Sequence, residues 1–289
     1  MNDVEPCDGS ETTSNDDPEG EHAHRDTTTR ASWNSGAGYE AYVGRWSGLV
    51  AAQLLGWLAP APHQRWLDVG CGTGRLSRAI LSLAQPSGVA GIDRSPEFVA
   101  YAQETVVDPR ITFQVGDAQA LPFASGTFDY AVSGLVLNFV PQPQRMVEEL
   151  LRVVRRDGTV ALYVWDYSAG MEFMRIFWDV AAEFDPATAD LDEGRRFSVT
   201  NPDALRTLFD GAGASASEVR AIDVPTAFES FNDFWDPFLA GQGPAPGYVG
   251  TLTDTQRERL RAALHDRLPI ATDGSIALTA RAWAVRATA

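Results

Sequence analysis

Nine residues, Trp-Leu-Asp-Val-Gly-Cys-Gly-Thr-Gly at positions 66–74, constrain the fold of this chain more than any other segment. A short apolar run ends in Asp68, and Gly70, Gly72 and Gly74 follow at alternate positions before a helical pattern begins. Glycine lets the backbone turn sharply and approach a ligand without a Cβ in the way. Free amides at the helix start would face polar or anionic ligand groups. We therefore expect a small-molecule cofactor at a strand–loop–helix unit.

The chain after this loop alternates between strand and helix patterns, which is typical of a doubly wound parallel sheet. Ser95 and Asn201, each followed by proline, are predicted helix caps. Strands are predicted at residues 65–69, 89–92, 111–115, 128–133 and 159–165, with two closing strands near 218–228 and 275–287. The fold class is therefore α/β, a doubly wound, mostly parallel, Rossmann-like sheet of seven strands.

One predicted helix, at residues 144–155, has an apolar side and a charged side. Glu148 and Arg152 are expected to pair on its outer face, because residues at i and i+4 are neighbours on a helix surface. Asp157 and Gly158 are typical turn residues and are predicted to lead the chain into the fifth strand.

After the fifth strand the alternation lapses, and a helical insertion or lid is predicted. Residues 170–184 form a helical pattern that is apolar on two sides, as in a helix packed between two layers. Aromatic residues at 231–238 indicate a second helix, and Thr253 and Gln256 form a capping box for a third. The Gly- and Pro-rich residues 241–250 are expected to be a loop. We expect the aromatic residues to be core, with an apolar pocket near the insertion.

The pattern divides the chain into a tail and one domain. Residues 1–30 have almost no apolar content, so they cannot offset their ordering entropy and are expected to be disordered. The domain, residues 31–289, is expected to contain an N-terminal helical cap at 31–60 and a cofactor-binding core at 61–166. Residues 167–289 would supply the substrate-side insertion and the closing strands.

Composition restricts the partners and the compartment. The formal net charge is −16 and all 23 basic residues are arginine, so neither a nucleic-acid partner nor a lysine Schiff base is expected. Cys7 and Cys71 offer no disulfide framework and no metal-ligand spacing, which indicates a reducing cytoplasm and no metal. No apolar run approaches the roughly 20 residues needed to span a bilayer. A small-molecule partner is expected, with the protein a monomer or a homodimer.

Residues around the glycine loop distinguish two cofactor classes. A dinucleotide site has a third glycine where this chain has Arg75, and Asp68 would repel a pyrophosphate. A carboxylate at that position suits a ligand with a positive charge and an amino group. S-adenosylmethionine has both, in its sulfonium and α-ammonium groups. Asp93 and Asp117 end the next two strands, so three carboxylates are expected along the edge where open α/β sheets bind ligands.

The segment Leu67-Asp68-Val69-Gly70-Cys71-Gly72-Thr73-Gly74 resembles the class I S-adenosylmethionine-dependent methyltransferases. The resemblance continues through Leu121-Pro122-Phe123, Phe128-Asp129 and Arg155-Arg156-Asp157-Gly158-Thr159, and is to the small-molecule branch typified by ubiquinone and menaquinone C-methyltransferases. It covers about residues 39–166 and is only architectural beyond them. Asn138 stands where the family often has histidine, so the proton chemistry of that histidine does not carry over.

The resemblance implies roles for individual residues. Asp93 would accept the ribose hydroxyls, Asp117 would meet the adenine amino group, and Tyr42 lies on the helix that closes over the cofactor in relatives. The implied cofactor-binding residues are Tyr42, Asp68, Gly70, Cys71, Gly72, Gly74, Asp93, Arg94, Asp117, Ala118 and Ser133. Four residues at the ends of strands four and five are candidate contacts of the methyl acceptor: Asn138, Trp165, Asp166 and Tyr167.

The leading hypothesis is therefore a methyltransferase for a small apolar or aromatic acceptor. No catalytic base is identified by the sequence. A non-catalytic S-adenosylmethionine-binding module or sensor is the alternative, and a turnover assay distinguishes it. A dinucleotide oxidoreductase is a third possibility, which Arg75 and Asp68 oppose.

Overall fold

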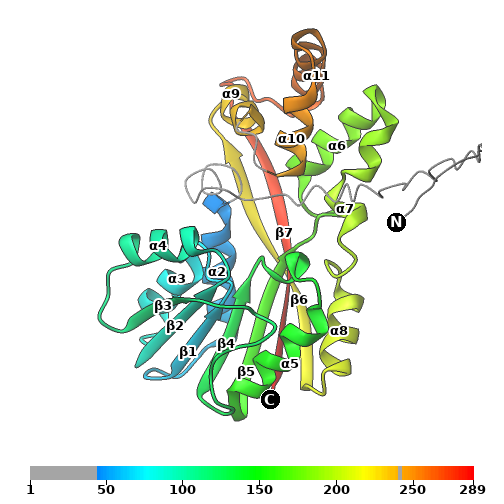
Figure 1. Ribbon diagram of the computed structural model, residues 1–289. Coiled ribbons are helices and arrows are strands. Elements are labelled where there is room, and N and C mark those ends of the chain that lie inside the picture. The colour runs from blue at the N-terminus through cyan, green and yellow to red at the C-terminus, as the bar shows by residue number, and fades with distance from the viewer. Residues whose placement is uncertain (1–43, 240–242) are drawn as a thin grey trace, which may run out of the picture. The chain divides into compact units, whose positions relative to one another are not determined.

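The computed structural model describes residues 44–239 and 243–289, which contain a seven-stranded sheet with helices on both faces (Figure 1). The strand order is β3-β2-β1-β4-β5-β7-β6, and all neighbours are parallel except the pairs that involve β7. The predicted α/β class and Rossmann-like sheet are confirmed. The strands are β1 (Arg65–Val69), β2 (Gly88–Asp93), β3 (Ile111–Val115), β4 (Phe128–Gly134), β5 (Val154–Trp165), β6 (Ser215–Phe228) and β7 (Ile276–Thr288). The predicted disordered tail, residues 1–30, lies outside the described residues.

Different helices cover the two faces of the sheet, because successive side chains of a strand point to opposite faces. In β4, Val132 packs into the core under α2, α3 and α4, whereas Ala131 packs into the core under α5 and α8. The helices are α2 (Arg45–Leu58), α3 (Arg75–Leu83), α4 (Pro96–Thr105), η2 (Leu137–Phe139), α5 (Pro143–Val153), α6 (Glu172–Phe184), η3 (Pro186–Asp190), α7 (Glu193–Arg196), α8 (Pro202–Gly211), α9 (Phe231–Trp235), η4 (Asp236–Leu239), α10 (Pro244–Thr251) and α11 (Asp254–Arg267). No helix among these is long and apolar enough to cross a bilayer.

Side-chain caps begin three helices at the predicted residues. Ser95 accepts a hydrogen bond from the amide of Phe98 at 3.2 Å at the start of α4. Asn201 caps α8 in the same way. Thr253 and Gln256 form both hydrogen bonds of the predicted capping box of α11. Each cap satisfies an amide that the first helical turn leaves unpaired, which is why these boundaries follow from local sequence.

Two predicted breaks are wrong. The predicted loop at residues 241–250 is wrong from residue 244 onward, where α10 begins. Ala245 and Tyr248 are buried, so burial outweighs the poor helix propensity of glycine and proline. Asp157 and Gly158, expected to be a turn, lie within β5. The pairing of β5 with β4 shifts register there and Asp157 has φ +61°, so the strand bulges without leaving the sheet.

Helix α5 also differs from the prediction in its ion pairs. Arg152 pairs with Glu149 at 2.7 Å, and not with Glu148, which pairs with Arg145 at 3.5 Å. Glu149 is only 5 % exposed, because it faces the connection between β3 and β4 rather than solvent. The outer-face pair expected from i,i+4 spacing is therefore replaced by a pair at i,i+3, in which Glu149 is buried and Arg152 is half-buried.

Strands β6 and β7 continue as a two-stranded ribbon beyond the end of β5. Pairing of β5 with β7 ends at Trp165 and Ala282, whereas β6 and β7 stay paired as far as Phe228 and Ile276. Helices α6, α9, α10 and α11 gather around the far end of this ribbon (Figure 1). We call these four helices together with η4 the insertion helices, and they occupy the place of the predicted helical insertion.

Aromatic side chains form the core of the insertion helices. Phe177 of α6 stacks on Phe238 of η4 with ring centroids 4.5 Å apart. Phe234 meets Phe228 of β6 at 5.2 Å, edge to face. All four rings are buried. The aromatic residues therefore pack against one another, as expected of core.

Candidate cofactor site at the carboxyl edge of the sheet

The glycine loop connects β1 to α3 at the carboxyl edge of the sheet. Gly70, Gly72 and Gly74 have φ values of +71°, +50° and +82°, the left-handed region that side chains disfavour. A Cβ on Gly70 would lie 2.3 Å from Val136, and one on Gly74 would lie 2.8 Å from Val106. A Cβ on Gly72 would meet nothing within 4 Å. The first and third glycines therefore permit close packing, and the second leaves open space on the loop surface.

Four amides of the glycine loop donate hydrogen bonds within the protein. The amides of Gly70 and Cys71 donate to the carbonyl of Ile92 at 2.7 and 3.0 Å. The amide of Gly72 donates to Asp93 Oδ2 at 2.9 Å, and that of Gly74 donates to the carbonyl of Cys71 at 2.8 Å. Three of these bonds fix the loop against β2, and the bond from Gly74 to Cys71 closes the loop on itself. These four amides therefore hold the loop in shape, while the open space at Gly72 allows close approach of a ligand.

Asp68 is a buried carboxylate at the end of β1, with no exposed surface. Ser77 Oγ donates to its Oδ2 at 2.6 Å, while its Oδ1 is buried without a hydrogen-bond partner. Burial raises the pKa of Asp68 to about 7, and the hydrogen bond from Ser77 opposes part of that rise. A buried carboxylate oxygen without a hydrogen bond destabilises the fold unless a donor binds it, and a cationic donor also balances its charge.

Asp93 ends β2, and Asp117 lies two residues after β3 at the same edge of the sheet. Asp93 accepts amide bonds from Gly72 and Ser95, both at 2.9 Å, and burial raises its pKa. Asp117 is exposed, and hydrogen bonds from the amide and side chain of Gln119 lower its pKa. The amide of residue 116 donates to the Asp93 carbonyl at 2.9 Å, which ties the two strand ends together.

The other predicted cofactor residues have mixed placements. The Cys71 side chain is buried, and burial raises its pKa well above the ordinary value, so the thiol stays protonated. Ser133 is buried and its hydroxyl donates to the Val69 carbonyl at 2.7 Å, so that group serves the sheet. Arg94 is exposed, and Ala118 packs against the core under α5. Tyr42 lies outside the described residues.

Two of the four candidate acceptor residues have unpaired donors near the ends of β4 and β5, and a third belongs to a group of aromatic rings. Asn138 Nδ2 and Trp165 Nε1 are buried without hydrogen-bond partners. Tyr167 lies against Phe197, with ring centroids 5.3 Å apart. Asp166 is different, because its Oδ1 accepts hydrogen bonds from Ser168 Oγ and the amide of residue 169 and so closes a turn. That carboxylate oxygen is used in the fold.

The sequence interpretation missed three residues, two beside the candidate acceptor contacts and one beside Asp68. Phe197 meets Phe139 at 5.4 Å, so the rings of Phe139, Phe197 and Tyr167 form a continuous series, here called the aromatic wall. Phe139 follows β4 and Phe197 follows α7, so no sequence spacing relates them. Ser77 is the third, and its place one helical turn after the loop was a usable signal that it could reach Asp68.

A cleft of about 220 Å³ lies among α6, η3 and α7, apart from the glycine loop. Arg175 and Arg195 line it together with Asp179 and Asp192, so its charges balance. None of the predicted cofactor residues lines it. Ser168, which donates to Asp166, is one of its lining residues.

Comparison with known proteins agrees with this geometry. The family described as "Methyltransferase domain" matches residues 67–162, from β1 into β5. The match thus covers the strands and the glycine loop that carry the three carboxylates, and it concerns this part of the chain alone. The predicted resemblance to S-adenosylmethionine-dependent methyltransferases is thereby confirmed.

Individual relatives share this part of the chain. A 2-methyl-6-phytyl-1,4-hydroquinone methyltransferase of Oryza sativa is 37% identical over 98 residues, covering 34% of this chain and 28% of that protein. An arsenite methyltransferase of Halobacterium salinarum is 29% identical over 212 residues, covering 70% of this chain and 52% of that one. The chain thus spans about half or less of the length of these relatives.

A solved structure shows the same fold. The phosphoethanolamine N-methyltransferase 2 of Haemonchus contortus in complex with S-adenosyl-L-methionine aligns with a TM-score of 0.55 at 18% identity. The alignment covers 88% of this chain and 57% of that one. At this identity the likeness concerns the fold alone.

The residues present fit S-adenosylmethionine. The unpaired Oδ1 of Asp68 matches an ammonium donor, and the open space at Gly72 admits a ligand against the backbone. Asp93 and Asp117 place further carboxylate oxygens along the same edge. A pyrophosphate in their place would meet three carboxylates at close range.

Proposed function

We propose that this chain is an S-adenosylmethionine-dependent methyltransferase that acts on a small apolar or aromatic acceptor. The observation that carries the proposal is the buried Asp68 carboxylate with one unpaired oxygen, beside a glycine loop with open space at Gly72. An ammonium group meeting Asp68 would satisfy that oxygen and its charge together.

In this proposal each carboxylate holds one part of the cofactor. Asp68 binds the ammonium, Asp93 accepts the ribose hydroxyls, and Asp117 accepts from the adenine amino group. The bound cofactor supplies a methyl group that is already activated by a sulfonium. The protein therefore needs to align the acceptor in line with that methyl and to exclude water. No described residue is assigned as a base.

The aromatic wall supports an apolar or aromatic acceptor. Phe139 is 41 % exposed although it is a large apolar residue, whereas Tyr167, which meets the same Phe197, is 9 % exposed. A planar or apolar acceptor would bury Phe139 and stack against the series. Asn138 and Trp165 would supply hydrogen-bond donors at the ends of β4 and β5.

We also carry forward the predicted division of the domain. Residues 61–166 would bind the cofactor, and residues 167–289 would shape the acceptor side. A small-molecule partner and a cytoplasmic location are part of the same proposal, since the Cys71 thiol is free and buried. We propose no nucleic-acid partner, because the charge of −16 would repel one.

Calorimetric titration with S-adenosylhomocysteine tests cofactor binding. We expect the wild type to bind, and Asp68→Ala, Asp93→Ala and Asp117→Ala each to weaken binding. Unchanged affinity in all three variants would overturn the proposed site. Transfer of a labelled methyl group to an apolar cell extract then tests activity. Binding without any transfer would favour the sensor, and binding of NADH instead would favour an oxidoreductase.

A further inference from the structure

The connection from β3 to β4 crosses the sheet without a helix. β3 is an edge strand, and β2 and β1 separate it from β4, so residues 116–127 must return from the carboxyl edge to the amino edge. Such crossovers are usually helical, which satisfies their backbone groups internally. Residues 116–127 contain no helix, so their backbone groups need other partners.

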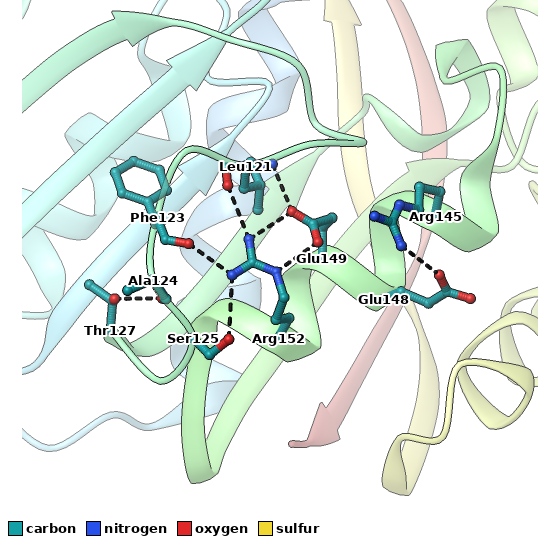
Figure 2. Close-up of polar contacts among 9 residues, drawn as sticks. All are labelled: Leu121, Phe123, Ala124, Ser125, Thr127, Arg145, Glu148, Glu149 and Arg152. Atoms are coloured by element: carbon teal, nitrogen blue, oxygen red, sulfur yellow. Dashed lines mark hydrogen bonds and ion pairs between the residues drawn. The ribbon is translucent and has the colours of Figure 1, made fainter.

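Two side chains of α5 supply those partners. Glu149 Oε2 accepts a hydrogen bond from the amide of Leu121 at 2.7 Å. Arg152 Nη2 donates to the carbonyl of Leu121 at 3.0 Å, and its Nη1 donates to the carbonyl of Phe123 at 2.8 Å (Figure 2). One ion pair thus satisfies three backbone groups of the connection.

Glu149 and Arg152 form a bidentate ion pair. Arg152 Nε and Nη2 meet the two carboxylate oxygens of Glu149 at 2.7 and 2.8 Å, a bidentate arrangement that fixes both planes. The hydrogen bond from Arg152 lowers the pKa of Glu149, and the same bond raises the pKa of Arg152, so both stay charged. The Glu149 side chain is 6% exposed, against 43% for Glu148 in the other pair of α5.

A second anchor lies at Gln119, between Asp117 and Leu121. The amide of Gln142, which precedes α5, donates to Gln119 Oε1 at 3.0 Å. Gln119 Nε2 in turn donates to Asp117 Oδ1 at 3.1 Å. The segment from Asp117 to Leu121 is therefore attached to α5 at both ends, although Asp117 itself makes no contact with the Glu149–Arg152 pair.

We propose that Glu149 and Arg152 are positioning residues that hold Asp117 in place for the cofactor, in the role that a crossover helix plays elsewhere. The inference rests on the proposed function, because it assigns Asp117 to the nucleoside end of the cofactor. The pair touches neither cofactor nor acceptor. It acts by fixing the backbone from Leu121 to Phe123.

The test is a double-mutant cycle on cofactor affinity. We expect Arg152→Ala to weaken S-adenosylhomocysteine binding about tenfold in calorimetry, a size usual for residues that act through a neighbour. In the Asp117→Ala background the same change should weaken binding little further, because the group being positioned is gone. Arg152→Lys should restore only part of the affinity, since lysine cannot form the bidentate pair.

The chain offers a matched control on the same helix. Arg145 and Glu148 also pair at i,i+3, but their side chains are 54% and 43% exposed (Figure 2). Arg145→Ala should leave the affinity unchanged. Gln119→Ala, which cuts the second anchor, should also weaken binding. Arg152→Lys, which keeps the positive charge, replaces Arg152→Ala in the test if that variant is unstable.

Three outcomes overturn the inference. One is unchanged affinity in Arg152→Ala or, where that variant is unstable, in Arg152→Lys. The others are an equal loss in Arg145→Ala, and a loss in Arg152→Ala that is fully additive with Asp117→Ala, which would mean a general structural effect. In each of these outcomes the wild type still binds S-adenosylhomocysteine. Failure of the proposed function would instead appear as no binding by the wild type.

Discussion

At the scale of single residues, Asp68 is the group whose surroundings depart most from what its side chain prefers. A carboxylate with no exposed surface ordinarily needs hydrogen bonds to both oxygens, and Asp68 has a partner only at Oδ2. Burial holds its pKa near 7, so it titrates close to neutral pH. Such perturbed groups concentrate at functional sites.

The pKa of Asp68 predicts a pH dependence of cofactor binding. An ammonium group binds the carboxylate and not the neutral acid. The affinity for S-adenosylhomocysteine should therefore rise by up to about tenfold per pH unit below a pH of about 7 and level off above it. Asp93, whose pKa is also raised, acts in the same direction. Asp68→Asn should flatten the profile measured by calorimetry, and a profile that stays unchanged in this variant would rule Asp68 out as its source.

Substitutions of two glycines should separate an effect on cofactor affinity from an effect on the stability of the fold. Gly72→Ala should cost about 1–2 kcal/mol of stability, because φ is +50°, and should weaken S-adenosylhomocysteine binding by intruding on the open space. Gly56→Ala is the control, since Gly56 lies inside α2 with nothing near its would-be Cβ. It should leave the affinity unchanged and stabilise the fold slightly. Thermal unfolding and calorimetry together check both statements, and equal affinities in the two variants would contradict the first.

At the scale of elements, the ends of β4 and β5 and the end of α7 combine to make the aromatic wall. Phe139, Tyr167 and Phe197 come from three elements whose order in the chain says nothing of their contact. Strand ends meet at one edge in any parallel sheet, so the positions of Phe139 and Tyr167 are a consequence of topology. The position of Phe197 depends on how α7 packs, which no local pattern specifies.

The aromatic wall predicts a selective effect on methyl transfer. Phe139→Ala should slow transfer to an apolar extract severalfold while S-adenosylhomocysteine affinity stays constant, because the ring lies on the acceptor side. Phe184→Ala is a matched control, since Phe184 is equally exposed, at 41%, at the end of α6. It should leave both measurements unchanged. Loss of cofactor affinity in Phe139→Ala would mean that the ring belongs to the cofactor site instead.

Element boundaries show where sequence reasoning succeeds and fails. Caps such as Ser95 and Thr253 were predictable because each bond joins residues three positions apart. Helix α10 and the bulge in β5 were not, because their causes are burial of Tyr248 and a register shift against β4. Arg152 likewise pairs with Glu149, the glutamate that faces the β3–β4 connection. Its contact there is with the carbonyl of Leu121, 31 residues away in sequence.

At the scale of the whole molecule, two buried carboxyls affect how stability varies with pH. Burial raises the pKa of Asp68 and of Glu193 to about 7, and Glu193 also accepts a hydrogen bond from Trp178 Nε1 at 2.6 Å. Both values lie above those of the unfolded chain, so the folded state holds these protons more tightly. Their contribution to stability is fully present below the unfolded values and is lost as pH rises through about 7. The negative net charge of −16 adds repulsion in the same direction.

The molecule should therefore unfold at a higher temperature at a pH of about 5.5 than at about 8. Thermal unfolding without ligand at both values, in buffers of equal ionic strength, checks this. The double variant Asp68→Asn and Glu193→Gln keeps the shapes of both side chains and removes their titratable carboxyl groups. The difference between the unfolding temperatures at the two pH values should therefore shrink. If the double variant shows the same difference in unfolding temperature, the pH dependence comes from surface charge and not from these two carboxyl groups.

Sequence alone determined the class of fold and the edge at which a cofactor binds. Strand and helix periods, caps and the three glycines are local, since each arises from backbone geometry or from bonds between near neighbours. Asp68, Asp93 and Asp117 follow from them, because parallel strands present their carboxyl ends together. Tertiary structure decided the rest: which Asp68 oxygen is unpaired, which rings meet beyond β4 and β5, and which glutamate Arg152 joins. These depend on packing between distant segments, whose geometry no single stretch of sequence encodes.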